Sequence, residues 1–314
     1  MNNDFFRLEI KNGIATIWID SQKDKMNIVS PSLMGDFDQI FNEIALNEKI
    51  KGAILISAKK DFIAGADIKS FTGEKIGDFQ PTSREGHKML NQIQQSKKPI
   101  ISAINGTCYG LGTEISLACH GRICSDDPRT KIALPEVKLG LLPGAGGTQR
   151  LPRLVGAQKA LEMITSGNFV GARDALALGI VDAVEAGDDI RQVGLAYAQK
   201  LAGEGAPVRR VRDIADKVEA DKGSDVFDQF RAGLAKKARG LFSPFKCVDA
   251  VEAAFTLPFA EGLKRERELF KECMESPQRA GLIHSFFAER EVSKVKGLAK
   301  DTPVREVKSV GIIG

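Results

Sequence analysis

Two glutamates stand in apolar surroundings where a carboxylate is unusual. Glu114 is the only Asp, Glu, Lys or Arg between Pro99 and Gly121, and Glu136 lies in the run LPEV. A carboxylate in such a run is paired, exposed by a turn of the chain, or retained for chemistry, because burying an unpaired charge is costly. The two residues are therefore the first candidates for acid–base catalysis.

The backbone predicted around Glu114 is suited to binding a negatively charged oxygen. Residues 99–104 predict a buried strand, residues 105–106 a turn, and glycines then open a helical pattern at residues 110–121. The free N–H groups of the first helical turn, near Leu111, would favour an anionic oxygen. An oxyanion site beside a carboxylate is the arrangement that enolate chemistry requires. A glutamate that only caps the helix is the alternative, and this segment alone leaves both open.

Composition argues against several classes of function. The chain has 314 residues, of which 43% are hydrophobic and 27% charged, and its net charge of +4 is too mild to predict nucleic-acid binding. Its five cysteines include no CxxC pair, and its three histidines form no triad and no metal-ligand spacing. No stretch is apolar enough to predict a signal peptide or a membrane span. We expect a cytoplasmic protein with no metal site.

Alternating strand and helix patterns predict an α/β core. Runs at residues 6–10 and 14–20 predict a hairpin, and a Ser-Pro pair at residues 30–31 predicts the start of a helix. A further buried strand is predicted at residues 53–57. The glycine-rich stretch 142–148 predicts a tight turn that presents amides, because no Gly-Lys-Ser/Thr follows to make a phosphate loop.

Three motifs in fixed order resemble those of the crotonase superfamily, the enoyl-CoA hydratases and isomerases. They are IAGADI at residues 63–68, NGTCYGLGTE at 105–114 and PEVKLGLLPGAGGTQRL at 135–151. The resemblance covers most of residues 5–300. It is most specific to the N-terminal part of the multifunctional enzymes of fatty acid oxidation, their alpha subunit in bacteria. It implies an α/β fold, a crotonase-like spiral of repeated ββα units with a helical C-terminal region.

The resemblance also implies a role for each matching residue. Glu114 and Glu136 would be the catalytic acids. The backbone N–H groups of Ala64 and Leu111 would form the oxyanion hole, and that of Gly144 would position the attacking water. The residues expected to contact coenzyme A are Ala66, Asp67, Ile68 and Lys69.

The implied reaction is the addition of water across trans-2-enoyl-CoA to give 3-hydroxyacyl-CoA, a step of fatty acid β-oxidation. The same site would also suit moving a double bond from the 3 to the 2 position. Coenzyme A enters as part of the substrate, and no other cofactor is expected for this reaction. The rival hypothesis is a non-catalytic acyl-CoA-binding or assembly module of the same fold, which could dispense with the two acids. A thiolase subunit is the protein partner that the resemblance implies.

Three regions are expected along the chain. Residues 1–189 would form the crotonase α/β core, 190–300 a helical C-terminal region with a linker helix, and 301–314 the start of a truncated NAD-binding domain. On this hypothesis NAD belongs only to the missing downstream domain, and an ordinary terminal strand or tail is the alternative. Residues 258–296 either fold back over the core and complete the CoA pocket or serve as a linker, and the two roles are compatible.

Overall fold

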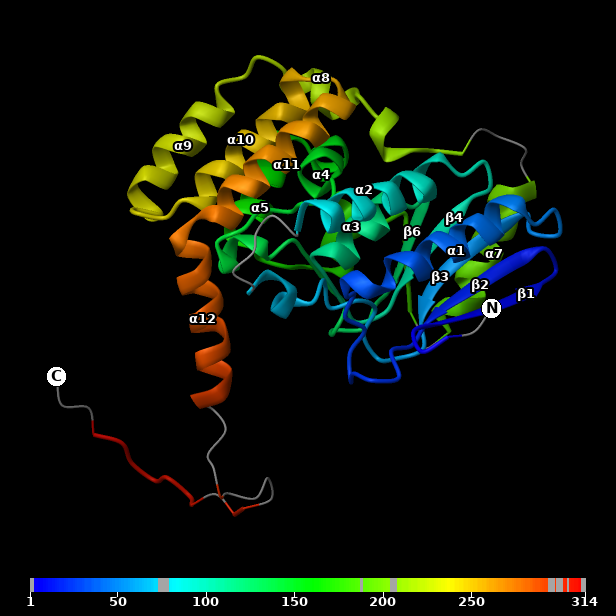
Figure 1. Ribbon diagram of the computed structural model, residues 1–314, viewed down its shortest axis with the longest axis horizontal. Coiled ribbons are helices and arrows are strands. Elements are labelled where there is room, and N and C mark those ends of the chain that lie inside the picture. The colour runs from blue at the N-terminus through cyan, green and yellow to red at the C-terminus, as the bar shows by residue number, and fades with distance from the viewer. Residues whose placement is uncertain are drawn as a thin grey trace.

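The main β-sheet has six strands, is mostly parallel and lies on the right of Figure 1. The computed structural model describes residues 3–72, 79–186, 189–203, 208–292, 297, 302–303 and 305–311. The sheet order is β1-β2-β3-β4-β6-β9, and β1 with β2 is its antiparallel pair. A smaller sheet has the order β5-β7-β8. The strands are β1 Phe6–Lys11, β2 Ile14–Ile19, β3 Gly52–Ser57, β4 Ile100–Ile104, β5 Thr107–Tyr109, β6 Gly121–Ser125, β7 Lys131–Ala133, β8 Val170–Gly171 and β9 Ala183–Glu185.

The two sheets arise from a repeated strand–strand–helix unit. Strand β4 joins the large sheet, β5 joins the small one, and the helix α3 (Leu111–Ala118) follows. In the next unit β6 joins the large sheet, β7 joins the small one, and the 3-10 helix η4 (Glu136–Leu139) follows. Each unit thus brings the end of a short strand to the start of a helical turn. The predicted spiral of ββα units is confirmed.

The N-terminal elements follow the sequence pattern closely. The predicted hairpin forms between β1 and β2, with Asn12 (φ 51°) and Gly13 (φ 78°) in left-handed conformations at its turn. The helix predicted from the Ser-Pro pair begins as a 3-10 helix, η1 (Pro31–Leu33), and continues as α1 (Met34–Leu46). Ser30 occupies the N-cap position of η1, but its side chain makes no capping hydrogen bond.

Helices cover both faces of the large sheet. All six residues of β3 are buried. Successive side chains of β3 point to opposite faces of the sheet and join two hydrophobic clusters. Ile54 packs in the cluster beneath α7 (Ile190–Gly203), and Leu55 belongs to the cluster that includes residues of α1 and α2 (Phe79–Gln95). Because α7 covers one face of the sheet, the α/β layers extend to residue 203, past the predicted boundary at 189.

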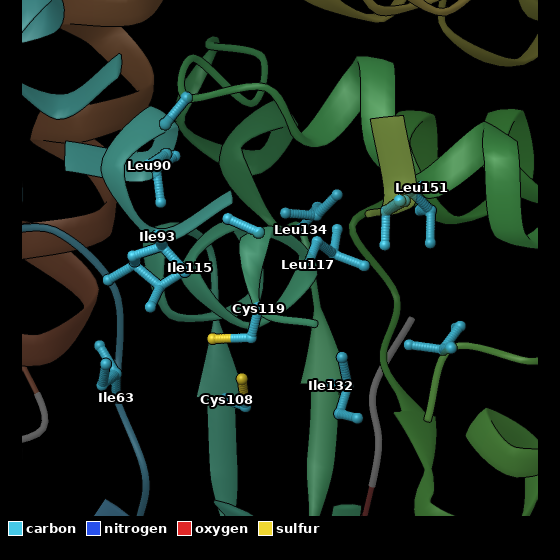
Figure 2. Close-up of a cluster of buried hydrophobic side chains, with 14 of the residues drawn as sticks. Ile63, Leu90, Ile93, Cys108, Ile115, Leu117, Cys119, Ile132, Leu134 and Leu151 are labelled. Carbon is cyan, nitrogen blue, oxygen red and sulfur yellow. The ribbon is translucent and has the colours of Figure 1, made fainter. Parts of the chain in front are cut away.

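Helix α3 is fixed by apolar packing on several sides. Figure 2 shows Ile115 and Leu117 of this helix among Leu90 and Ile93 of α2 and Leu134. All of these side chains are at most 1% exposed. Interiors packed this closely allow little movement, so the side chains at the start of α3 are held in place.

The helical C-terminal region folds back on the core. Helix α10 (Ser243–Thr256) packs against α4 (Gly147–Val155), α5 (Ala157–Ser166) and α11 (Phe259–Glu275), and α12 (Pro277–Val292) contacts η4. Within residues 301–314, the expected start of an NAD-binding domain, residues 305–311 have no regular secondary structure, and residues 301, 304 and 312–314 lie outside the described part. No helix in the described ranges is long and apolar enough to cross a membrane.

The helices after α3 are α4 Gly147–Val155, α5 Ala157–Ser166, α6 Ala172–Ala177, α8 Asp216–Asp221, α9 Val226–Lys237, α10 Ser243–Thr256, α11 Phe259–Glu275 and α12 Pro277–Val292, with the short 3-10 helices η2 Ile68–Phe71 and η5 Val211–Asp213.

Gly106, in the turn between β4 and β5, should not tolerate a side chain. Its φ is +64°, and a Cβ there would collide with the Lys60 carbonyl oxygen and lie 2.8 Å from Asp61 Oδ1. We expect Gly106→Ala to lower the free energy of unfolding by about 1–3 kcal/mol, measured by urea denaturation. Gly233→Ala, in the middle of α9 with nothing within 4 Å, is the control and should be neutral or stabilising. Equal stability of the two variants would contradict this account.

Candidate active site

A cavity of about 420 Å³ brings the three sequence motifs together. Both candidate glutamates line it, although they come from different ββα units. The C-terminal helices complete its wall, with Phe270 from α11 and Arg290 from α12. Among the predicted site residues, those that line it are Ala64, Ala66, Ile68, Leu111, Glu114, Glu136 and Gly144.

Glu114 is held by backbone amides. It lies in the first turn of α3 and is 2% exposed. Its Oε1 accepts hydrogen bonds from the N–H groups of Ala145 at 2.7 Å and Gly147 at 2.8 Å. Burial raises the pKa of Glu114, and these two amides oppose that rise because they favour the ionised carboxylate.

The backbone of residues 144–148 points its amides in two directions. Ala145 and Gly147 donate to Glu114, whereas Gly146 and Thr148 donate to Glu266 on α11. The N–H of Gly144 has no hydrogen-bond partner among the described residues, and Gly144 lines the cavity. This amide is therefore free to bind a water or a substrate atom, and its role in positioning the attacking water stays a prediction.

Glu136 has a different environment from Glu114. It is half-buried at the start of η4, and its Oε2 is shielded without a hydrogen-bond partner in the described residues. Burial raises the pKa of Glu136 well above its usual value, and the charge of Glu114 raises it further. Because no donor stabilises its ionised form at Oε2, Glu136 is the better proton donor of the pair.

The predicted oxyanion donor at Ala64 is wrong, because its amide is already engaged. Its N–H donates to the carbonyl oxygen of Asn27 at 2.9 Å. Leu111, the other predicted donor, is the first residue of α3, and its N–H has no partner among the described residues. One of the two predicted amides is therefore available to a ligand.

The free amide on the second motif is that of Ala66. Val29 N–H donates to Gly65 O, and Asp67 N–H donates to Val29 O, so the intervening Ala66 N–H points away from Val29. It has no partner among the described residues. Gly65 approaches the 109–110 backbone closely: a Cβ on it would lie 3.3 Å from Tyr109 O. The Ala66 and Leu111 amides thus follow two glycines, Gly65 and Gly110, that lie against each other.

The predicted CoA contacts divide into two groups. Ala66 and Ile68 line the cavity, but Asp67 and Lys69 are not on its wall. Asp67 instead accepts a hydrogen bond from the Lys69 N–H and caps η2. The basic residues that line the cavity, within the described ranges, are Lys138 and Arg290, which the sequence analysis did not single out. Lys138 lies two residues after Glu136 within the third motif, so its position was available from the sequence.

The chain resembles known proteins in sequence and in fold. A family profile described as "Enoyl-CoA hydratase/isomerase" matches residues 9–234, which is more than half of the chain. The chain belongs to the enoyl-CoA hydratase/isomerase family. A curated family relative, the fatty acid oxidation complex subunit alpha of Shewanella putrefaciens, is 38% identical over 309 residues, covering 96% of this chain and 43% of the relative. The chain therefore spans less than half the length of that relative.

Solved structures show the same fold. An enoyl-CoA hydratase from Bacillus anthracis has a TM-score of 0.59 and 24% identity, covering 90% of this chain and 96% of that one. A carnitinyl-CoA dehydratase from Mycobacterium thermoresistibile has a TM-score of 0.72 and 17% identity, covering 95% of this chain and 94% of that one. At these identities the likeness establishes the crotonase fold, as the sequence predicted.

The raised pKa of Glu136 predicts a pH dependence of stability. A carboxyl group with a higher pKa in the folded state binds more protons there than in the unfolded chain. Its stabilising contribution is present below pH 4.5 and is lost as the pH rises through the folded-state pKa. Urea denaturation should show the free energy of unfolding falling over this range, and falling less in Glu136→Gln. The exposed Glu261→Gln is the control, and a slope unchanged by Glu136→Gln would contradict the prediction.

Proposed function

We propose that this chain hydrates trans-2-enoyl-CoA to 3-hydroxyacyl-CoA. The observation that carries the proposal is the placement of two carboxylates with different protonation preferences in one cavity with three free amides, those of Ala66, Leu111 and Gly144. Hydration needs both a base for the water and an acid for the carbon, and charge develops on the thioester oxygen between them. The family membership and the similarity to fatty acid oxidation subunits support the same reaction.

The geometry supports a division of labour between the acids. The thioester oxygen binds between the N–H groups of Ala66 and Leu111, which stabilise the enolate-like charge. Gly144 N–H and Glu114 hold the water; its oxygen attacks C3, and Glu114 takes its proton. Glu136 delivers its own proton to C2, and proton exchange with solvent restores both acids. Glu114 suits the base role because two amides favour its ionised form.

Isomerisation of a 3-enoyl-CoA to the 2-enoyl form is the second candidate. It would use the same oxyanion hole, with Glu136 removing a proton from C2 and returning it at C4. The shielded and unpartnered Oε2 of Glu136 favours such a shuttle. A non-catalytic acyl-CoA-binding module is disfavoured, because such a module has no use for two carboxylates in one cavity. The thiolase partner and an NAD-dependent activity of a longer protein are expectations from the resemblance.

Replacing either acid should lower turnover while leaving substrate binding nearly intact. We expect Glu114→Gln and Glu136→Gln each to reduce kcat by about 10²–10⁴-fold, because each removes a proton-transfer group. Loss of the conjugated-enoyl absorbance measures hydration, and calorimetry with a CoA ester measures binding. Glu261→Gln, exposed on α11, is the matched control. Near-normal kcat in an acid variant would remove that residue from the mechanism.

The CoA phosphates are expected to be bound by Lys138, which lines the cavity, rather than by Lys69. Loss of one charge-assisted phosphate contact costs about 1.5–3 kcal/mol. Lys138→Ala should therefore raise KM about tenfold or more with kcat changed little, at 1.4 kcal/mol per factor of ten. Lys69→Ala should leave both near wild type, as should Lys159→Ala, a control on α5 that does not line the cavity. If Lys69→Ala raised KM more than Lys138→Ala did, Lys69 would be the residue that binds the CoA phosphates, as the resemblance implied.

A further inference from the structure

Helix α11 places a carboxylate in the interior of the protein, outside the set of catalytic residues. Glu266 is 0% exposed, and it lies on the same helical stripe as the buried Leu263 and Phe270. Burying a carboxylate is costly unless donors satisfy it. The groups that donate hydrogen bonds to Glu266 therefore indicate which part of the structure it holds in place.

Within the described part of the chain, its hydrogen-bond partners all lie in residues 144–148, the loop that leads into the first turn of α4 and also binds Glu114. Glu266 Oε1 accepts from Gly146 N–H at 2.7 Å. Its Oε2 accepts from Thr148 N–H at 3.1 Å and from Thr148 Oγ1 at 2.5 Å. The alternate amides of the same loop, at Ala145 and Gly147, donate to Glu114. Residues 144–148 are thus held between two carboxylates that bind alternate peptide groups.

Arg150 holds the same loop by its carbonyl side. Its Nη1 donates to the Ala145 carbonyl oxygen at 3.0 Å, and its guanidinium interacts electrostatically with both Glu114 and Glu266. The loop contains three glycines, so its backbone has little intrinsic rigidity. Its conformation therefore depends on these hydrogen bonds.

We propose that Glu266 is a positioning residue that acts on catalysis through residues 144–148. By fixing the Gly146 and Thr148 peptides, it orients the Ala145 and Gly147 amides toward Glu114 and leaves the Gly144 amide facing the cavity. The kinetic part of this inference rests on the proposed hydration. On this proposal α11 contributes to catalysis through Glu266, a residue that does not line the cavity.

Glu266→Gln keeps the shape of the side chain but turns one acceptor oxygen into an NH2 group facing an N–H donor. We expect kcat for hydration to fall by about 10–100-fold, because small misplacements of catalytic groups have effects of this size. KM should change by less than about threefold, since Glu266 does not line the cavity. Glu268→Gln, two residues along the same helix and exposed, is the matched control. Unchanged kcat in Glu266→Gln would overturn the proposal.

A double variant tests whether Glu266 acts through Glu114. In the Glu114→Gln background, adding Glu266→Gln should lower kcat by less than about threefold, because residues that act as a unit are not additive. Full multiplication of the two losses would show that Glu266 acts elsewhere. If Glu266→Gln does not fold, Thr148→Val removes one of the three hydrogen bonds at nearly constant shape, and it should lower kcat and not KM.

An amide-exchange measurement separates this inference from the proposed function. In wild-type protein labelled with ¹⁵N-glycine, the Gly147 N–H should be protected by its bond to Glu114, and Glu266→Gln should speed its exchange about tenfold or more. Glu268→Gln should leave it unchanged. If wild type does not hydrate enoyl-CoA but this exchange changes as expected, the proposed function fails and the structural role of Glu266 stands. Unchanged Gly147 exchange in Glu266→Gln would refute that role whatever the activity.

Discussion

The arrangement of this site depends on the need of two buried carboxylates for hydrogen-bond donors. Glu114 and Glu266 come from helices far apart in the chain, and both are satisfied by one loop at residues 144–148. The loop can serve both because it contains glycines where the chain approaches other groups closely. A Cβ at Gly147 would lie 2.9 Å from Glu114 Oε1, and one at Gly144 would lie 2.6 Å from Phe270 Cδ2. The composition of this loop therefore follows from the space available on its two sides.

The same need for hydrogen-bond donors explains how two glutamates in one cavity can differ in protonation state. Amides at 2.7 and 2.8 Å favour the charged form of Glu114, whereas Glu136 Oε2 has no donor in the described residues. Each charge also disfavours ionisation of the other, so the pair titrates as a unit. Different protonation preferences at the same pH thus arise from the position of backbone N–H groups. No difference in residue type is needed.

Much of this site could be predicted from the sequence, because its motifs are local. The apolar run around Glu114 and the strand before it are readable from periodicity, and both are present. The short strand β5 between the turn and the helix was not predicted, and the helix ends at Ala118, so that Gly121 begins strand β6 instead of ending the helix. The choice between Ala64 and Ala66 was not predictable in this way. Which N–H is free depends on pairing with Asn27 and Val29, more than thirty residues earlier. Glu266 was missed because it lies in a helix rich in exposed charges, although its spacing from Leu263 and Phe270 gave a signal.

The C-terminal helices contribute to the site although they lie beyond the part of the chain that the family profile matches. The family match ends at residue 234, yet Phe270 and Arg290 line the cavity, and Glu266 accepts hydrogen bonds from the loop at residues 144–148. These contacts run from α11 and α12 back to residues near the middle of the chain. The loop and α11 therefore need each other. Without the loop Glu266 would be a buried carboxyl group with no donors, and without α11 the Gly146 and Thr148 amides would lose their acceptor. The C-terminal helices are thus part of the structure that keeps Glu114 in place.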